Sequence, residues 1–159
     1  MFNVEKELFE AYAFYTAIVT CKMILMSFLT ARQRFKTMTF ISSEDAKQPG
    51  TKVSYSLPQD LSYIKCFQCG TNEDIERVRR AHQNDIENVV PFAILGLLYI
   101  FTNPAYSTAL LCFRLFAGAR ILHTVVYLLA IPQPARAILF FANIFTNFYM
   151  GYKIIAAFM

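Results

Sequence analysis

The chain has 159 residues, of which 56% are hydrophobic and only 16% are charged, and its formal net charge is +4. Soluble domains are nearer about 45–50% apolar and about 25% charged, so this composition argues against an ordinary water-soluble protein and indicates membrane spans. Nucleic-acid binding is also disfavoured, because no nucleic-acid-binding motif accompanies the positive charge.

Four apolar stretches follow one another along the chain. They predict an all-α integral membrane protein whose single domain is a four-helix bundle. The expected spans are residues 11–29, 79–101, 108–130 and 137–158, and the long loop is expected at about residues 32–72. The second span is short on apolar residues alone. It reaches the roughly 20 residues of a bilayer helix only if its helix continues backward through a charged segment.

The first span and the long loop set the expected orientation. The residues before the span include Glu5, Glu7 and Glu10 but no basic cluster, so we expect no cleavable signal and a span that inserts itself. Nine Lys and Arg residues lie between residues 30 and 85, whereas the connection at residues 102–107 has none. The positive-inside rule therefore predicts a cytosolic loop and lumenal termini.

The long loop also carries a Cys-x-x-Cys motif at Cys66 and Cys69. A zinc site needs four ligands and no second pair has matching spacing, so we expect no metal here. After the loop, Thr71 or Asn72 is expected to cap the next helix, since acidic residues in its first turn suit the helix dipole.

Polar residues inside the spans are the strongest functional signal. On a helical second span, Arg80, Asn84 and Glu87 fall within about 60° of one another. In the third span Arg120, His123 and Tyr127 share one face by the same spacing.

Topology brings these groups to one membrane layer. Span 1 ends in Arg32-Gln33-Arg34, and span 4 opens with Pro132-Gln133-Pro134-Ala135-Arg136, both at the cytosolic face with the two polar stripes. Ionisable groups are costly in a membrane, so this convergence predicts one polar pocket walled by several helices. The competing interpretation is that charges only pair helices, and Lys22 and Arg114 are the residues for which either role stays open.

A pocket rich in arginine, with one carboxylate and one amide, suits a small polyanionic ligand that carries an amine. Arginine binds carboxylates bidentately, and a cationic pocket favours a thiolate over a thiol. Because the pocket lies against lipid, its ligand would meet a hydrophobic partner from the bilayer.

Residues 76–88, Glu-Arg-Val-Arg-Arg-Ala-His-Gln-Asn-Asp-Ile-Glu-Asn, resemble the signature of the MAPEG superfamily, the membrane-associated proteins of eicosanoid and glutathione metabolism. Further matching segments occur in the same order along the chain: residues 31–34, 113–114, 118–121, 123–127 and 132–136. The chain looks closest to the microsomal glutathione S-transferase members of that superfamily.

This resemblance implies a homotrimer that binds glutathione between neighbouring subunits at the cytosolic side, with glutathione as co-substrate and no other cofactor. It makes Arg120 the catalytic position, where the thiolate would be held. The positions that it implies for glutathione binding are Arg34, Arg79, Arg80, His82, Asn84, Glu87, Tyr127 and Arg136.

The implied activity is conjugation of glutathione to hydrophobic electrophiles for detoxification, with reduction of lipid hydroperoxides beside it. The implied location is the endoplasmic reticulum membrane, and also the mitochondrial outer membrane. Three alternatives stay open: a prostaglandin E synthase-like isomerase, a non-catalytic lipid-binding protein of the same fold, and a channel or scaffold. Ala137 counts against the isomerase, because in the related synthases a serine follows the arginine matched by Arg136.

Overall fold

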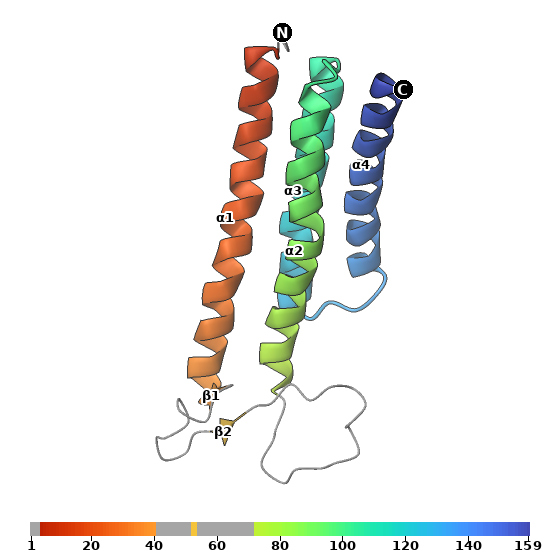
Figure 1. Ribbon diagram of the computed structural model, residues 1–159. Coiled ribbons are helices and arrows are strands. Elements are labelled where there is room, and N and C mark those ends of the chain that lie inside the picture. The colour runs from red at the N-terminus through yellow and green to blue at the C-terminus, as the bar shows by residue number, and fades with distance from the viewer. Residues whose placement is uncertain (1–3, 41–51, 54–71) are drawn as a thin grey trace.

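The computed structural model describes residues 4–40, 52–53 and 72–159, in which four long helices run side by side (Figure 1). They are α1 (Lys6–Thr37), α2 (Glu73–Ile100), α3 (Tyr106–Leu128) and α4 (Ala135–Phe158). Both chain ends lie at one end of the bundle, called here the terminal end (Figure 1). The opposite end, where α1 stops and α2 starts, is called the loop-side end.

The order of the helices in space places α2 and α3 at the centre. Each of these two helices contacts the other and also both α1 and α4, whereas α1 and α4 lie apart on opposite sides. At the loop-side end the short strands β1 (Thr39–Phe40) and β2 (Lys52–Val53) pair in parallel, with Thr39 opposite Lys52. This arrangement confirms the all-α prediction, since the strands have two residues each.

Three of the helices, α1, α3 and α4, are long and apolar enough to cross a membrane. The second predicted span differs, because α2 is not among them although it is 28 residues long. The expected backward extension of this helix is confirmed: it begins at Glu73, well before its apolar part. The charged segment is therefore helical, so the spacing of its polar residues fixes their directions around the axis of α2.

The helix ends follow the local chemistry. Asn72 caps α2, and its side-chain oxygen accepts hydrogen bonds from the backbone N–H groups of Asp74 (3.0 Å) and Ile75 (3.3 Å). The last turn of α1 contains Arg34 and Lys36, which suit the negative end of the helix dipole. This helix continues to Thr37, so the connection starts later than the expected residue 32.

The main hydrophobic core lies in the terminal half of the bundle. The rings of Phe92 and Phe116 stack there with centroids 3.9 Å apart. Gly96 admits the ring of Tyr12, because a Cβ at this position would lie 2.8 Å from Tyr12 Cε2. Tyr12 then donates a hydrogen bond to the carbonyl of Ala93 (2.7 Å), which joins α1 to α2. Tight apolar packing thus fixes the positions of the helices on the terminal side of the polar residues.

Candidate functional site

An ion cluster joins three helices in the middle of the bundle. Lys22 of α1 pairs with Asp85 of α2, and Lys22 Nζ also donates to Thr124 Oγ1 of α3 (2.8 Å). Asp85 Oδ1 lies 3.5 Å from Nη1 of Arg120, also on α3. Asp85 and Arg120 are each 0% exposed, so this cluster is sealed from solvent in the single chain. Its groups need one another because lipid offers them no partner.

Arg120 is held mainly by an amide rather than by a carboxylate. Its Nη1 donates to the backbone oxygen and to Oδ1 of Asn84, and its Nη2 donates to the same Oδ1, each at 3.0 Å. Its Nε is buried and has no hydrogen-bond partner among the described residues. The guanidinium is therefore fixed in place by neutral acceptors and keeps an unused donor.

A second group of polar side chains continues along α3 toward the loop-side end. The rings of His123 and Tyr127 lie 5.4 Å apart, and the guanidinium of Arg136 on α4 lies 5.0 Å from the centre of the Tyr127 ring. Nδ1 of His123 and Nε of Arg136 are buried, and neither has a partner in the described part of the chain. Two nitrogens beside one aromatic ring thus leave their hydrogen-bonding capacity unused within the described residues.

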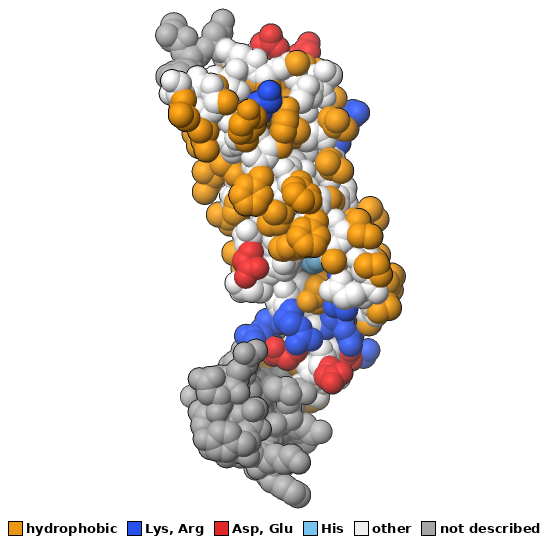
Figure 2. Space-filling model, turned by 90° about the vertical axis from the view of Figure 1, so that its right-hand side faces the viewer, with side chains coloured by type: hydrophobic (Ala, Val, Ile, Leu, Met, Phe, Trp, Pro, Cys, Tyr) orange, Lys and Arg blue, Asp and Glu red, His pale blue; other side chains and the backbone are white. Residues whose placement is uncertain are grey.

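The first turns of α2 carry an exposed arginine rim. Figure 2 shows Lys and Arg side chains gathered in a band near the loop-side end, while hydrophobic side chains cover the middle of this face. Arg77 pairs with Asp74 (2.7 Å) and Arg79 with Glu76 (3.1 Å). Arg80 is exposed and has no ion pair with any described residue. Within the described residues, Arg80 is thus the arginine of the rim without an acidic partner.

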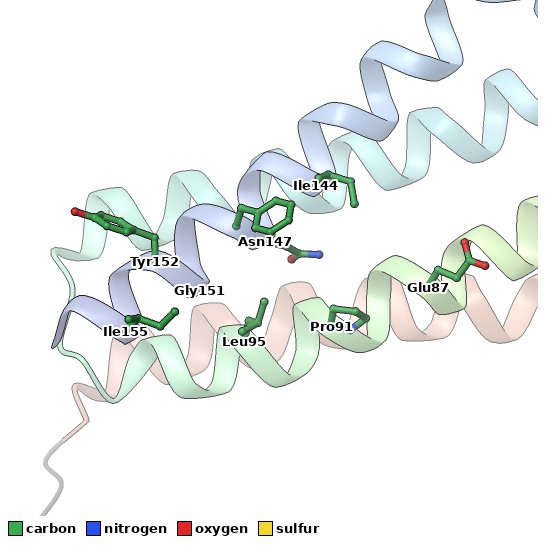
Figure 3. A pocket seen from close by; sticks show the side chains of 9 residues that line it. Glu87, Pro91, Leu95, Ile144, Asn147, Gly151, Tyr152 and Ile155 are labelled. Atoms are coloured by element: carbon green, nitrogen blue, oxygen red, sulfur yellow. The ribbon is translucent and has the colours of Figure 1, made fainter. Parts of the chain in front are cut away.

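Glu87 sits at one end of an apolar groove between α2 and α4 (Figure 3). The groove has a volume of about 430 Å³, and its other lining residues are Pro91, Leu95, Ile144, Asn147, Phe148, Gly151, Tyr152 and Ile155. Glu87 accepts a hydrogen bond from Gln83 (3.3 Å) and stays exposed. A carboxylate therefore lies at the end of an apolar groove.

The structure brings together some of the sequence-predicted residues and separates others. Arg120 contacts Asn84 directly. His123 and Tyr127 follow Arg120 along α3, and Arg136 of α4 lies over the Tyr127 ring. Arg79, Arg80 and Glu87 stand exposed on α2 outside the ion cluster. Arg34 and His82 are half-buried and make no ion pair within the described ranges, and Nε of Arg34 is buried without a partner.

The open question about Lys22 and Arg114 resolves in the same way for both residues. Lys22 pairs with Asp85, and Nε of Arg114 donates to the hydroxyl of Tyr15 on α1 (3.0 Å). Each is an interhelical partner. Lys22 and Arg114 therefore pair helices, as the competing interpretation expects. That interpretation does not explain the exposed arginines in the first turns of α2, which do not join α2 to another described helix.

Asp85 and Thr124 are members of the cluster that sequence reasoning missed. Asp85 lies inside the quoted motif, but it falls off the Arg80–Asn84–Glu87 stripe and so drew no attention. One signal could have found it: Lys22 is a cation in the middle of an apolar span and requires an anion at the same depth. Asp85 is the acidic residue of the second span at that level, with side-chain exposure of 0%.

The Cys66 and Cys69 motif lies outside the described residues. Among those that the structure does describe, no group of three or more His, Cys, Asp or Glu side chains is placed to hold a metal ion.

Comparison with known proteins finds relatives across the chain. The MAPEG family model matches residues 12–156. Microsomal glutathione S-transferase 1 of Sus scrofa is 42% identical over 152 residues, which cover 96% of this chain and 92% of the relative. The Homo sapiens protein of that name is 41% identical over 153 residues, with the same coverage. Prostaglandin E synthase of Bos taurus is 32% identical over 128 residues, covering 80% of this chain and 74% of the relative.

Proposed function

This chain belongs to the MAPEG family, and from that premise we propose that it is a membrane-bound glutathione S-transferase that conjugates glutathione to hydrophobic electrophiles. The observation that carries the proposal is the positioning of Arg120 by Asn84 of α2, the helix that also carries the arginine rim and lines the apolar groove. The relatives named as microsomal glutathione S-transferase 1 support it, at about 40% identity over nearly the whole chain.

The proposed binding mode uses the charges of glutathione. Its two carboxylates are bound by the arginines at the loop-side end, with Arg80 as the exposed cation that has no partner among described residues. Its amine is bound by Glu87, and the polar group of His123, Tyr127 and Arg136 lines the same level. The other arginines that we assign to carboxylate binding are Arg34 and Arg79, and His82 completes the set.

The proposed chemistry is nucleophilic substitution by the glutathione sulfur. The thiol loses its proton to water, the thiolate attacks the electrophilic carbon, a C–S bond forms, and the leaving group departs with its electron pair. Arg120 supplies the positive charge that stabilises the thiolate. Since this guanidinium is 0% exposed, its charge acts from a site without water, where electrostatic interactions are strong.

The groove between α2 and α4 offers a route for the second substrate. Its lining is apolar apart from Glu87 and Asn147, so a molecule dissolved in the bilayer can enter it without losing its hydrophobic contacts. Bringing a water-soluble thiolate and a lipid-soluble electrophile into one site accelerates their reaction by proximity.

The same thiolate is proposed to reduce lipid hydroperoxides. Two glutathione molecules and one hydroperoxide give oxidised glutathione, the corresponding lipid alcohol and water. The sulfur attacks the outer peroxide oxygen, and the second glutathione then displaces that oxygen as water by forming the disulfide. No metal is needed for this electron balance.

We further propose that three chains assemble, that glutathione lies between neighbours, and that the loop-side end faces the cytosol. The Lys and Arg side chains gathered near the loop-side end support this orientation, because positive charge favours the cytosolic side (Figure 2). The proposed location is the endoplasmic reticulum membrane, and also the mitochondrial outer membrane. Native mass spectrometry in detergent would give the number of chains.

The first test compares the purified protein with and without glutathione. Glutathione at 100 times its Kd is expected to stabilise the folded protein by about 2.7 kcal/mol, seen as a higher melting temperature. Conjugation of an electrophilic aryl halide in micelles is then measured, followed by glutathione oxidation with a lipid hydroperoxide. Absence of both stabilisation and conjugation would leave the proposal without support and favour a non-catalytic protein of the same fold.

A prostaglandin E synthase-like isomerase is the second candidate. The synthase of Bos taurus supports it less well, with 32% identity over 80% of this chain. The same purified protein, incubated with glutathione and a prostaglandin endoperoxide, is expected to give no isomerised product above the rate without protein.

A further inference from the structure

The charges of the ion cluster do not balance. Lys22 and Arg120 bring two positive charges to the middle of the bundle, and Asp85 is the carboxylate that both of them approach. The side chains of Asp85 and Arg120 are 0% exposed, and that of Lys22 is 13% exposed. An uncompensated charge is costly at such a depth, and within the described residues one positive charge of the cluster has no carboxylate of its own.

The hydrogen bonds of Lys22 and Arg120 show which of the two cations is less compensated by Asp85. Lys22 is the cation that donates a hydrogen bond to Asp85, and it is held there by a second bond to Thr124. Arg120 lies 3.5 Å from Asp85 Oδ1 and gives all of its recorded hydrogen bonds to Asn84 instead. Asn84 is neutral, so it orients the guanidinium without cancelling its charge.

We propose that Lys22 is a positioning residue for the thiolate: by pairing with Asp85, it keeps the positive charge of Arg120 available to the anionic sulfur of glutathione. This inference rests on the proposed function and assigns to α1 a role in the chemistry. Without Lys22, Asp85 has Arg120 as its remaining cationic neighbour in the cluster. The carboxylate then neutralises the guanidinium that the sulfur needs.

The neighbouring charged and titratable groups come from all four helices. Lys22 lies on α1, Asp85 on α2, Arg120 and His123 on α3, and Arg136 on α4, with His123 within electrostatic range of Lys22, Arg120 and Arg136. Asp85 is the negative member of this group. Its pairing with Lys22 therefore bears directly on how much of the positive charge of Arg120 is compensated.

The test is a double-variant cycle on purified full-length protein in detergent micelles. Lys22→Met, Asp85→Asn and Lys22→Met/Asp85→Asn are compared with wild type, and Arg114→Gln is the control that removes another interhelical contact of a cation. The thiolate of bound glutathione is followed by its ultraviolet absorbance as pH is varied. Conjugation of an aryl halide gives kcat and KM for glutathione.

Lys22→Met is expected to raise the pKa of the bound thiol by about one unit, and so to lower kcat by about tenfold at pH values below the wild-type thiol pKa and by less at higher pH, with a smaller change in KM. The double variant removes both members of the pair and is expected to restore kcat to within about threefold of wild type. Arg114→Gln is expected to leave the thiol pKa at the wild-type value.

Each outcome separates this inference from the proposed function. If wild type forms no glutathione thiolate, the transferase proposal itself fails. If wild type forms it and Lys22→Met has the wild-type thiol pKa, the role of Lys22 is overturned. If Lys22→Met does not fold, the double variant decides: a wild-type thiol pKa supports the role, whereas a raised pKa or a failure to fold overturns it.

Discussion

The terminal half of the bundle and its loop-side half hold the same helices together in different ways. In the terminal half, a continuous set of buried apolar side chains packs around Tyr12, Phe92, Phe113 and Phe116. In the loop-side half the buried apolar cluster is small, consisting of Met26, Val78 and Ala81. Between them lies the ion cluster. The loop-side half thus has less apolar packing and more buried polar side chains.

The two halves also show that position, rather than residue type, sets what an arginine does. Arg120 is buried and fixed by three hydrogen bonds to Asn84, whereas Arg80 is exposed and makes no ion pair with described residues. Buried charges stabilise or destabilise the fold by several kcal/mol, and exposed ones contribute little to it. Substitutions can therefore separate folding from binding.

The largest expected effect comes from Asp85→Asn, which leaves Lys22 and Arg120 buried without their carboxylate. Removing one partner of a buried ion pair costs about 3–5 kcal/mol of folding free energy. Thermal unfolding followed by the circular dichroism of the helices in micelles measures the loss. The matched control is Asp74→Asn at the exposed pair with Arg77, expected to cost about 0–1 kcal/mol. Equal losses for the two variants would contradict the contrast between the halves.

The next effect concerns binding rather than stability. Arg80→Gln removes the exposed cation and is expected to weaken glutathione binding by about 1.5–3 kcal/mol, the value of a hydrogen bond to a charged group. Its melting temperature without glutathione is expected to stay that of wild type. Calorimetric titration of glutathione into the protein measures the affinity. Arg77→Gln serves as the control, because Arg77 already forms an ion pair with Asp74. An equal loss of glutathione affinity in Arg77→Gln would contradict the assignment of Arg80 to the proposed site.

The smallest effect tests the packing of the terminal half. Gly96→Ala places a Cβ 2.8 Å from the Tyr12 ring, so the ring must move and its bond to Ala93 is strained. The expected cost is about 1–3 kcal/mol of folding free energy, with glutathione affinity unchanged for the folded protein. Gly118→Ala is the control, since within the described residues no side chain beyond its immediate chain neighbours and no neighbouring helix lies within 4 Å of its added Cβ. A glutathione affinity that fell in Gly96→Ala would show that the two halves are coupled.

Much of the fold was readable from the residues alone. Apolar runs predict helices because a membrane requires every backbone group to be bonded within its own segment. The acidic start after Asn72 predicts where α2 begins, and the spacing of Arg120, His123 and Tyr127 predicts their common face. These features depend on near neighbours along the chain, and helical geometry converts their spacing into position.

Only the tertiary structure decided which charged side chains contact one another across the helices. Lys22 and Asp85 are separated by 63 positions and Arg120 and Asn84 by 36, and each contact joins two different helices. The sequence placed Lys22 in a span and Asp85 in a motif, but helical periodicity gives the face of one helix and not its rotation against the next. Packing of large and small side chains, such as Tyr12 against Gly96, sets that rotation. The sequence by itself therefore determined the helices and the kind of charge available, and only their packing determined that Asp85 binds Lys22 and leaves Arg120 to Asn84.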